Sequence, residues 1–212
     1  GECYQNCRRE FQVVSDDGDA EFTLGNNYIM SAKDLCTLPF IDKLLDTGVD
    51  ALKIEGRNRS PEYVRTVVAA YRKAINAWQA GHLTEELKDR LVEEARTVYN
   101  RDFSSGFFLG RPITEFANLN GSAATQRKQH VGVVMDYYRK AGAVEVNVQD
   151  HLFSAGDTLM IQGPTTGVVT FQADDIRQDE TQVDTVSRGI VTIGLQTRVR
   201  ENDKVFLLVR DS

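Results

Sequence analysis

Residues Gly48–Trp78 decide the fold, and they read GVDALKIEGRNRSPEYVRTVVAAYRKAINAW. Near the start of this stretch, residues 51–55 alternate apolar and charged side chains, which predicts a strand. Its two charges, Lys53 and Glu55, would lie on one face of that strand. Gly56 ends the strand, so the stretch begins as the last strand of a parallel α/β unit.

A helix is expected to follow. Ser60 is a good N-cap, and Pro61 suits the first helical position because its missing N–H would have no intrahelical partner there. Apolar side chains then recur at three- and four-residue spacing as far as Ala80, which predicts one apolar stripe packed against a sheet. The stripe consists of Val64, Val67, Val68, Tyr71, Ile75 and Trp78.

Two cations, Arg57 and Arg59, lie between the strand and the helix. Parallel α/β folds keep their chemistry in the loops that follow the carboxyl ends of strands. Both arginines, together with Ser60 at the helix N-terminus, would bind a carboxylate through charge-assisted hydrogen bonds. A small dicarboxylate suits this arrangement. The alternative is that both arginines are solvated loop charges.

Lys53 and Glu55 would point inward near the same edge. One interpretation makes them catalytic: Glu55 accepts or donates a proton, and Lys53 sets its pKa. The other interpretation makes them a buried ion pair that holds the sheet together. Ser31, Lys33 and Asp34 follow a short strand predicted just before them, and Ser31 with Asp34 is typical of a capping box that opens a helix.

Three cysteines form the candidate metal site. Cys3 and Cys7 lie four residues apart and directly before Arg8 and Arg9, and cationic neighbours favour the thiolate that binds a metal. Cys36 follows the next predicted strand. The alternative is two incidental cysteines in a loop and one buried in a helix. A zinc ion shared between cysteine and His82 or another histidine is a further alternative.

Composition limits the function. The chain has 212 residues, a formal charge of −6 and 41% hydrophobic residues, which is typical of an ordinary globular protein with no general affinity for polyanions. Neither a transmembrane run nor a signal peptide is visible, so a cytoplasmic protein is expected. The three histidines are scattered, and the sequence has no Gly-x-Ser-x-Gly or His-Glu-x-x-His motif, so no standard hydrolytic machinery is visible.

The phrase KIEGR, followed by S-P-x-Y-V and Y-R-x-A-I and preceded by YIMSAKDLC and CYQNCRREF, resembles the collagenase-like U32 peptidase family. The match covers residues 1–80 closely and the remainder loosely. Members were labelled peptidases, while several relatives resemble oxygen-independent hydroxylases that act on tRNA, ribosomal RNA or ubiquinone with an iron-sulfur cluster. Some of these take prephenate as the source of the oxygen atom.

The resemblance implies a cofactor and an upstream part of the protein that lies outside this chain. Cys3, Cys7 and Cys36 would ligate an iron-sulfur cluster whose fourth ligand lies outside this chain. A parallel strand over residues 51–55 needs neighbours on both sides, and residues 1–47 offer at most one. We therefore expect the C-terminal half of a larger protein, with the upstream half as its partner and little activity in this part alone.

The remaining chain predicts smaller elements. Alternating runs at residues 10–14 and 21–24 flank an acidic, glycine-containing turn and predict a hairpin, Tyr28–Met30 predicts a short strand, and Pro39 would interrupt a helix that ends near residue 48. Thr84 is expected to cap a further helix.

Beyond residue 130 the periodicity changes to short β runs, which predicts a closed antiparallel barrel. Ala155-Gly156-Asp157 and Glu201-Asn202-Asp203, each before a strand, make this part similar to the second domain of elongation factor Tu. The seven expected strands are Val131–Met135, Ala143–Val148, Thr158–Ile161, Gly167–Phe171, Gln182–Val186, Ile190–Ile193 and Val205–Val209.

The predicted fold class is therefore α/β plus all-β. Residues 1–80 would be the last part of a TIM-like (βα)8 barrel with a cysteine-containing hairpin, residues 81–129 a helical and loop connector, and residues 130–212 the small barrel. This last segment holds eight Lys and Arg against twelve Asp and Glu, so RNA contact is expected only at its aromatic and basic cluster, Tyr137–Lys140. Three functions remain open: an iron-sulfur hydroxylase, a peptidase, and a non-catalytic module that binds RNA or a ligand.

Overall fold

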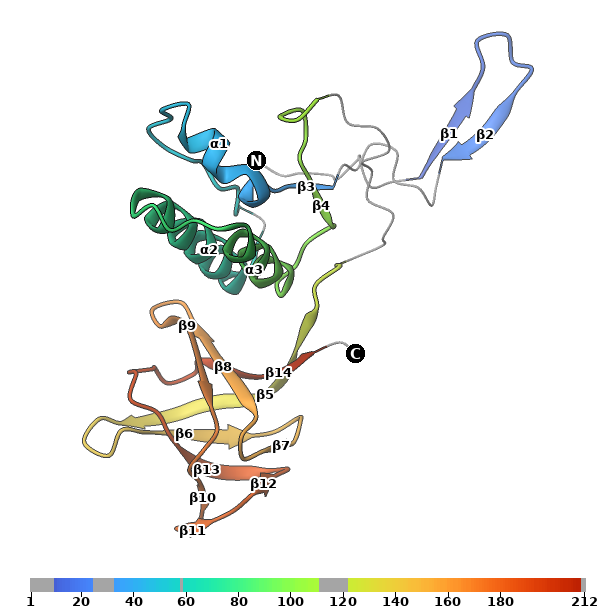
Figure 1. The fold of residues 1–212 in the computed structure, drawn as a ribbon. Coiled ribbons are helices and arrows are strands. Elements are labelled where there is room, and N and C mark those ends of the chain that lie inside the picture. The colour runs from blue at the N-terminus through green and yellow to red at the C-terminus, as the bar shows by residue number, and fades with distance from the viewer. Residues whose placement is uncertain (1–9, 25–32, 58, 111–121, 211–212) are drawn as a thin grey trace. The chain divides into compact units, whose positions relative to one another are not determined.

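The computed structural model describes residues 10–24, 33–57, 59–110 and 122–210 (Figure 1). The chain forms two compact units. Unit 1 comprises residues 1–59 and 66–124, and unit 2 comprises residues 60–65 and 125–212. Cys3, Cys7, Tyr28–Met30 and Ser31 lie outside the described residues.

Unit 1 contains the predicted hairpin. Strands β1 (Phe11–Val14) and β2 (Glu21–Leu24) pair antiparallel, with Val14 opposite Glu21. Their turn is closed by the Gly18 amide, which donates to the Ser15 carbonyl at 2.9 Å. The acidic turn between two alternating runs was thus a reliable indication of a hairpin.

A short parallel pair follows, where a helix was predicted. Strand β3 (Asp34–Leu35) lies beside β4 (Phe103–Ser104), and backbone hydrogen bonds of 2.9 Å join Asp34 N to Asp102 O and Cys36 N to Ser104 O. The prediction that Asp34 lies in the first turn of a helix is therefore wrong. Asp34 is part of a strand because its backbone pairs with a segment almost seventy residues later, which local capping rules cannot anticipate.

The helical part of unit 1 begins after this pair. A 3-10 turn, η2 (Leu38–Phe40), contains Pro39 near its start and leads into α1 (Ile41–Leu45). The longest helix is α2 (Pro61–Gln79), and α3 (Glu85–Arg96) follows it, with Thr84 Oγ1 accepting from the Leu87 amide at 3.2 Å. The starts predicted at Pro61 and Thr84 are confirmed, and both follow from local preferences: proline suits a first helical position, and a threonine side chain caps a first turn.

The core of unit 1 lies between these helices. Leu38, Ile41, Ala70, Ala74 and Leu91 are almost completely buried together. The buried face of α2 is therefore Val67, Ala70 and Ala74, while Val64 and Val68 of the predicted stripe are exposed. The expected strand at residues 51–55 is instead extended chain without a paired strand in the described part of the protein.

Unit 2 is dominated by one antiparallel sheet of eight strands, whose order is β11-β10-β13-β6-β5-β14-β8-β9. A separate pair joins β12 to β7. The strand bounds are β5 (Gln126–Tyr138), β6 (Ala143–Val148), β7 (Phe153–Ser154), β8 (Thr158–Gly163), β9 (Gly167–Gln172), β10 (Ile176–Gln178), β11 (Thr181–Gln182), β12 (Thr185–Val186), β13 (Gly189–Gly194) and β14 (Lys204–Arg210).

The antiparallel strands of unit 2 follow the prediction, but the closed barrel does not. Within the residues described, β9 and β11 end the strand order and are not paired with each other. The sheet nevertheless curls around one core, because Phe171 of β9 and Ile176 of β10 contact the same apolar cluster. Short β7 and β10 were not predicted, since two or three residues carry no measurable periodicity.

Two close approaches fix the backbone of unit 2. A Cβ atom on Gly132 would lie 1.9 Å from the Asn147 carbonyl oxygen of β6, beside a register shift between β5 and β14. Asp203, only 2% exposed, accepts hydrogen bonds from Arg200 N at 2.8 Å and Thr166 Oγ1 at 2.5 Å. A Cβ on Gly163 would lie 1.6 Å from the Asp203 carboxylate. Glycine in these strands therefore marks positions that have no room for a side chain.

Candidate functional site

The predicted acid and base residues lie on the extended segment before α2. Lys53 and Glu55 are exposed, and the half-buried residues between and before them are Ile54 and Leu52. The Glu55 Oε1 atom accepts a hydrogen bond from the Arg57 amide at 2.8 Å. That hydrogen bond is the main reason that the pKa of Glu55 is lowered. The alternation predicted for a strand survives, but its charged face lies in solvent.

The two loop arginines have different surroundings. Arg57 is exposed, whereas the Arg59 side chain is only 16% exposed. Arg59 Nη2 contacts both carboxylate oxygens of Asp34 at 3.1 Å, and its guanidinium lies 4.6 Å from the centre of the Tyr99 ring. Of the predicted ligand-binding pair, Arg57 is therefore presented to solvent and Arg59 is part of the architecture. The Ser60 carbonyl accepts from the Val64 amide at 3.2 Å, which places Ser60 at the start of α2.

Asp34 is the centre of this arrangement. Besides Arg59, it accepts from Arg101 Nε at 2.8 Å, from the Arg101 amide at 3.1 Å and from Arg101 Nη2. Its side chain is 12% exposed, so the carboxylate is held between two guanidinium groups with little water. Charge-assisted hydrogen bonds of this kind are about twice as strong as neutral ones.

A second carboxylate completes the cluster. Asp102 contacts Lys33 Nζ at 2.9 Å and Arg96 Nη1 at 3.0 Å. Burial opposes its charged form, but the hydrogen bonds from Lys33, the Phe103 amide and Arg96 outweigh burial and lower the pKa of Asp102 to about 2. Asp102 also has a φ of 65°, in the left-handed region. We call the six charged residues Lys33, Asp34, Arg59, Arg96, Arg101 and Asp102 the ion cluster.

The ion cluster lies at the edge where β3 and β4 begin. Asp34 is the first residue of β3, and Arg101 and Asp102 directly precede β4. In parallel α/β folds ligands bind beyond the carboxyl ends of strands, which is the opposite edge. The cluster therefore ties together the loops before the two strands. Arg101 and Asp102 could not be predicted from the sequence, since no local motif marks them and only their pairing with Asp34 and Lys33 reveals their role.

Of the three predicted cysteine ligands, Cys36 is the one that the structure describes. It is 6% exposed within the core of unit 1, and burial raises the pKa of its thiol. Tyr71 lies beside it and accepts a hydrogen bond from the Thr37 amide at 2.9 Å, and burial raises the pKa of Tyr71 to about 12. Metal binding by Cys36 stays a prediction, and it would require the thiol to lose its proton.

Metal binding at the other candidates stays a prediction, since Cys3 and Cys7 lie outside the described residues. His82, the alternative zinc ligand, is exposed after the end of α2. In the part of the chain that the structure describes, no group of three His, Cys, Asp or Glu side chains is placed to hold a metal ion.

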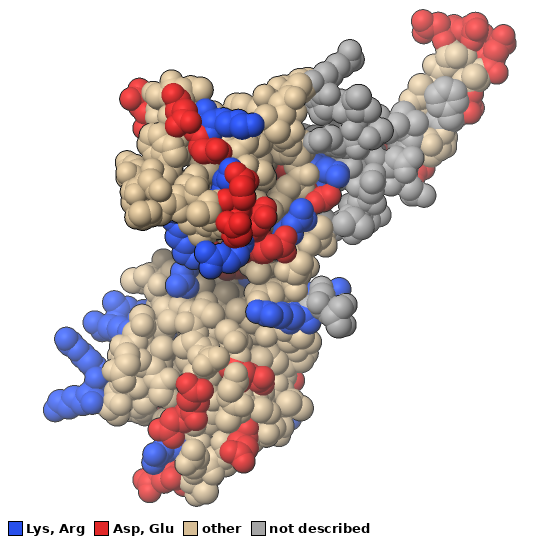
Figure 2. All heavy atoms as spheres, viewed as in Figure 1, with Lys and Arg blue, Asp and Glu red and all other residues tan. Residues whose placement is uncertain are grey.

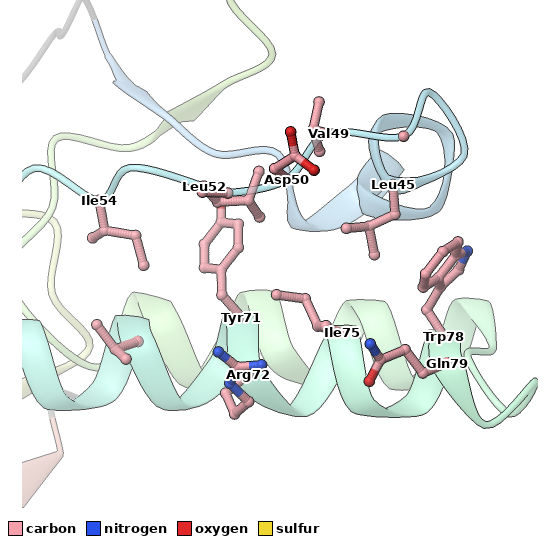
Figure 3. Close-up of a pocket in the computed structure, with 13 residues that line it drawn as sticks. Leu45, Val49, Asp50, Leu52, Ile54, Tyr71, Arg72, Ile75, Trp78 and Gln79 are labelled. Carbon is pink, nitrogen blue, oxygen red and sulfur yellow. The ribbon is translucent and has the colours of Figure 1, made fainter.

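A hollow of about 610 Å³ runs along α2 (Figure 3). Leu52 and Ile54 of the extended segment point from one side, while Tyr71 and Ile75 face them from the helix. Trp78 lies at one end, where its indole Nε1 donates to Asp46 at 3.0 Å. Part of the apolar stripe thus faces a single extended segment across this hollow instead of a sheet.

The different surroundings of the two arginines lead to a paired expectation. Arg57→Ala should leave the melting temperature unchanged within about 2 °C and weaken the affinity for a dicarboxylate about ten- to a hundred-fold, because one charge-assisted hydrogen bond is lost. Arg59→Ala should lower the melting temperature, because Asp34 loses a partner. Thermal melts and isothermal titration with one dicarboxylate check both variants. Normal affinity in Arg57→Ala would show that Arg57 is a solvated loop charge.

Comparisons with known proteins agree on a family. The model for peptidase family U32 matches residues 1–118. A collagenase of Porphyromonas gingivalis is 40% identical over 207 residues, which are 97% of this chain and 50% of that protein. The tRNA hydroxylation protein P1 of Bacillus subtilis is 34% identical over 77% of this chain and 40% of that protein. The tRNA hydroxylation protein P of Escherichia coli is 33% identical over 65% of this chain and 29% of its own length.

The chain therefore spans half or less of the length of these relatives. None of the helices described in the structure is both long and apolar enough to cross a membrane.

Proposed function

Because the chain belongs to peptidase family U32, whose model matches residues 1–118, we propose that it is part of a protein that takes part in the hydroxylation of tRNA. The complete protein would use an iron-sulfur cluster and a carboxylate co-substrate such as prephenate. Relatives named tRNA hydroxylation proteins in Bacillus subtilis and Escherichia coli support this choice. The sequence blocks CYQNCRREF, YIMSAKDLC and KIEGR support it too.

One observation weighs against Glu55 as the general base of a peptidase. In unit 1 the pKa values of Asp42, Glu55 and Asp102 are all lowered. A carboxylate that activates water works best when its pKa is raised toward the working pH. Carboxylates with lowered pKa values are weak bases, so they favour electrostatic roles such as holding cations in place. Glu55 as a proton acceptor would need a different environment from the one that it has here.

The same residues support an anionic ligand. The exposed Arg57 lies two residues after Glu55, and its backbone amide donates to the Glu55 carboxylate at 2.8 Å. The guanidinium is therefore directed by a fixed backbone while its N–H groups remain in solvent. A planar carboxylate would accept two parallel hydrogen bonds from it. We assign Arg57 the role of contacting the co-substrate, and Arg59 the role of supporting the loop through Asp34.

The iron-sulfur cluster would be held by Cys3 and Cys7 together with ligands from elsewhere in the protein. When bound, an iron-sulfur cluster supplies electron transfer that no side chain supplies. Arg8 and Arg9 next to these thiols favour the thiolate form. Cys36, a buried cysteine of unit 1, is the third proposed ligand.

Deletion of the gene that encodes this chain tests the proposal. Bulk tRNA from the deletion strain should lack a hydroxylated nucleoside that mass spectrometry detects in the parent strain. The complete gene should restore it, and the gene with Cys7→Ser should not, while anaerobically purified Cys7→Ser protein should lose its visible absorption and iron. An unchanged nucleoside profile after deletion would refute the proposed function.

Peptidase activity is the second candidate, because the collagenase of Porphyromonas gingivalis is 40% identical to this chain. The complete protein, purified through several columns, would then cleave gelatin, and Glu55→Gln would abolish the cleavage. The matched variant Glu94→Gln, at an exposed carboxylate paired with Lys73, would leave it intact. If neither gelatin cleavage nor tRNA hydroxylation occurs, a non-catalytic binding module is the remaining interpretation.

A further inference from the structure

Unit 2 carries an exposed cationic and aromatic surface at the turn between β5 and β6. Its members are Tyr138, Arg139 and Lys140 from the turn, and Gln196 and Arg198 from the loop after β13; we call them the hairpin surface. All five residues are exposed, Tyr138 by 41%. Figure 2 shows Lys and Arg side chains projecting at the left, on the side to which the β5–β6 turn points in Figure 1.

The two segments of the hairpin surface are joined by direct contacts. Leu195 N donates to the Gly142 carbonyl at 2.7 Å, and Tyr137 Oη donates to the Gln196 carbonyl at 2.9 Å. A Cβ atom on Gly142, whose φ is 61°, would lie 2.6 Å from the Gln196 side-chain amide. The loop that carries Arg198 is therefore packed against the turn that carries Arg139 and Lys140. Cations almost sixty residues apart in the sequence are held on one surface.

The charges of the hairpin surface differ from those of unit 1. Arg139, Lys140 and Arg198 make no ion pair with any residue that the structure describes, whereas Lys33, Arg59 and Arg101 of unit 1 are all paired with Asp34 or Asp102. Asp136 and Glu145 lie close by, so the local excess is about one positive charge. A surface with so small an excess cannot hold a duplex by charge alone, because duplex binding depends on neutralising many phosphates.

The aromatic ring decides which ligand fits. The Tyr138 hydroxyl donates to Glu145 Oε1 at 3.1 Å, which holds the ring in one orientation while leaving it exposed. Exposed aromatic rings beside a few cations are typical of surfaces that stack unpaired bases and contact the adjoining phosphates. The amide of Gln196 adds a donor and an acceptor for a base edge.

We propose that the hairpin surface binds single-stranded RNA, with one base stacked on Tyr138 and adjoining phosphates contacted by Arg139, Lys140 and Arg198. This inference rests on the proposed function, since it names the part of the protein that would hold unpaired nucleotides of the tRNA substrate. It places RNA recognition in unit 2, whereas the family model matches only residues 1–118.

The test measures binding by the full chain to a fluorescein-labelled single-stranded oligoribonucleotide, by fluorescence anisotropy at several salt concentrations. The parent should bind the single strand more tightly than the duplex formed with its complement. Tyr138→Ala should raise the Kd about five- to fifty-fold, because base stacking is lost. The Kd of Tyr138→Phe should stay within about two-fold of the parent value, because the ring is kept. The double variant Arg139→Ala/Lys140→Ala should reduce the slope of log K against log salt by about 1.4.

Arg188→Ala is the matched control. Arg188 is also exposed, but it precedes Gly189, at the far end of β13 from Gly194, which pairs with Ala143 beside the turn. Five residues of strand separate the two ends by roughly 17 Å. This variant should bind RNA as the parent does. Circular dichroism of each variant verifies that the sheet is folded.

Two results would overturn the inference: equal affinity of Tyr138→Ala and Arg188→Ala for the RNA, or tighter binding of a labelled acidic peptide than of the RNA. The second result would make the surface a protein contact. Binding is measured without any hydroxylation, so the two proposals fail separately. If tRNA keeps its hydroxyl group after gene deletion while binding still depends on Tyr138, the surface stands and the proposed function fails.

Discussion

Gly132→Ala should unfold unit 2 or destabilise it by about 3 kcal/mol or more. The added Cβ would lie 1.9 Å from the Asn147 carbonyl oxygen and 2.9 Å from the Asn147 carbonyl carbon. Both are backbone atoms of β6, so no side chain can move aside and the strands themselves must separate. The lower entropy of the unfolded alanine chain offsets at most about 1 kcal/mol of this cost.

Scanning calorimetry checks this expectation, with Gly194→Ala as the control. Gly194 lies in β13 of the same sheet, and its added Cβ would meet only the Asp175 side chain, at an ordinary 3.7 Å. The midpoint temperature of the unit 2 transition should fall by about 12 °C or more in Gly132→Ala and by less than about 4 °C in Gly194→Ala. Equal melting of the two variants would mean that β5 and β6 do not approach each other as closely as described.

Asp34→Ala should destabilise unit 1 by about 2 to 4 kcal/mol. The substitution leaves Arg59 and Arg101 facing each other without their shared carboxylate, and both guanidinium groups are mostly buried, with side chains 16% and 24% exposed. Removing one partner of a buried ion pair typically costs about 3 to 5 kcal/mol, and partial access of water reduces this cost. Asp34→Asn should lower the free energy of unfolding by less, because one oxygen atom of its side chain remains to accept a hydrogen bond.

Fluorescence of the single tryptophan measures this change selectively. Trp78 lies in α2 and belongs to unit 1, so urea unfolding followed by its emission monitors this unit. Glu94→Ala is the control: its ion pair with Lys73 has side chains 44% and 55% exposed, and such pairs contribute about 0 to 1 kcal/mol. If Asp34→Ala unfolds at the same urea concentration as Glu94→Ala, the ion cluster does not stabilise unit 1.

Local chemistry determined much of the secondary structure. Ser60 with Pro61 and Thr84 start helices because capping depends on a few neighbouring residues, and the alternation at Ala143–Val148 marks a strand because each second side chain enters the core. The family, too, follows from short sequence blocks, and the match to residues 1–118 confirms it.

Partners distant in the sequence decided the rest. Asp34 is in a strand because its backbone meets Asp102, and the Arg59 guanidinium is paired with the Asp34 carboxylate. Residues 51–55 keep their alternation but form no strand, since a strand needs a neighbour that supplies its backbone hydrogen bonds.

The sequence by itself therefore determined where helices begin, which segments alternate and which family the chain belongs to, because these depend on neighbours within a few residues. Only the tertiary structure decided which charges are paired and which are presented to solvent. Arg57 and Arg59 are two residues apart and chemically identical, yet one is exposed and the other is bound to Asp34. Charge pairing depends on distances of 3 to 4 Å between side chains from different elements, and no local pattern encodes such distances.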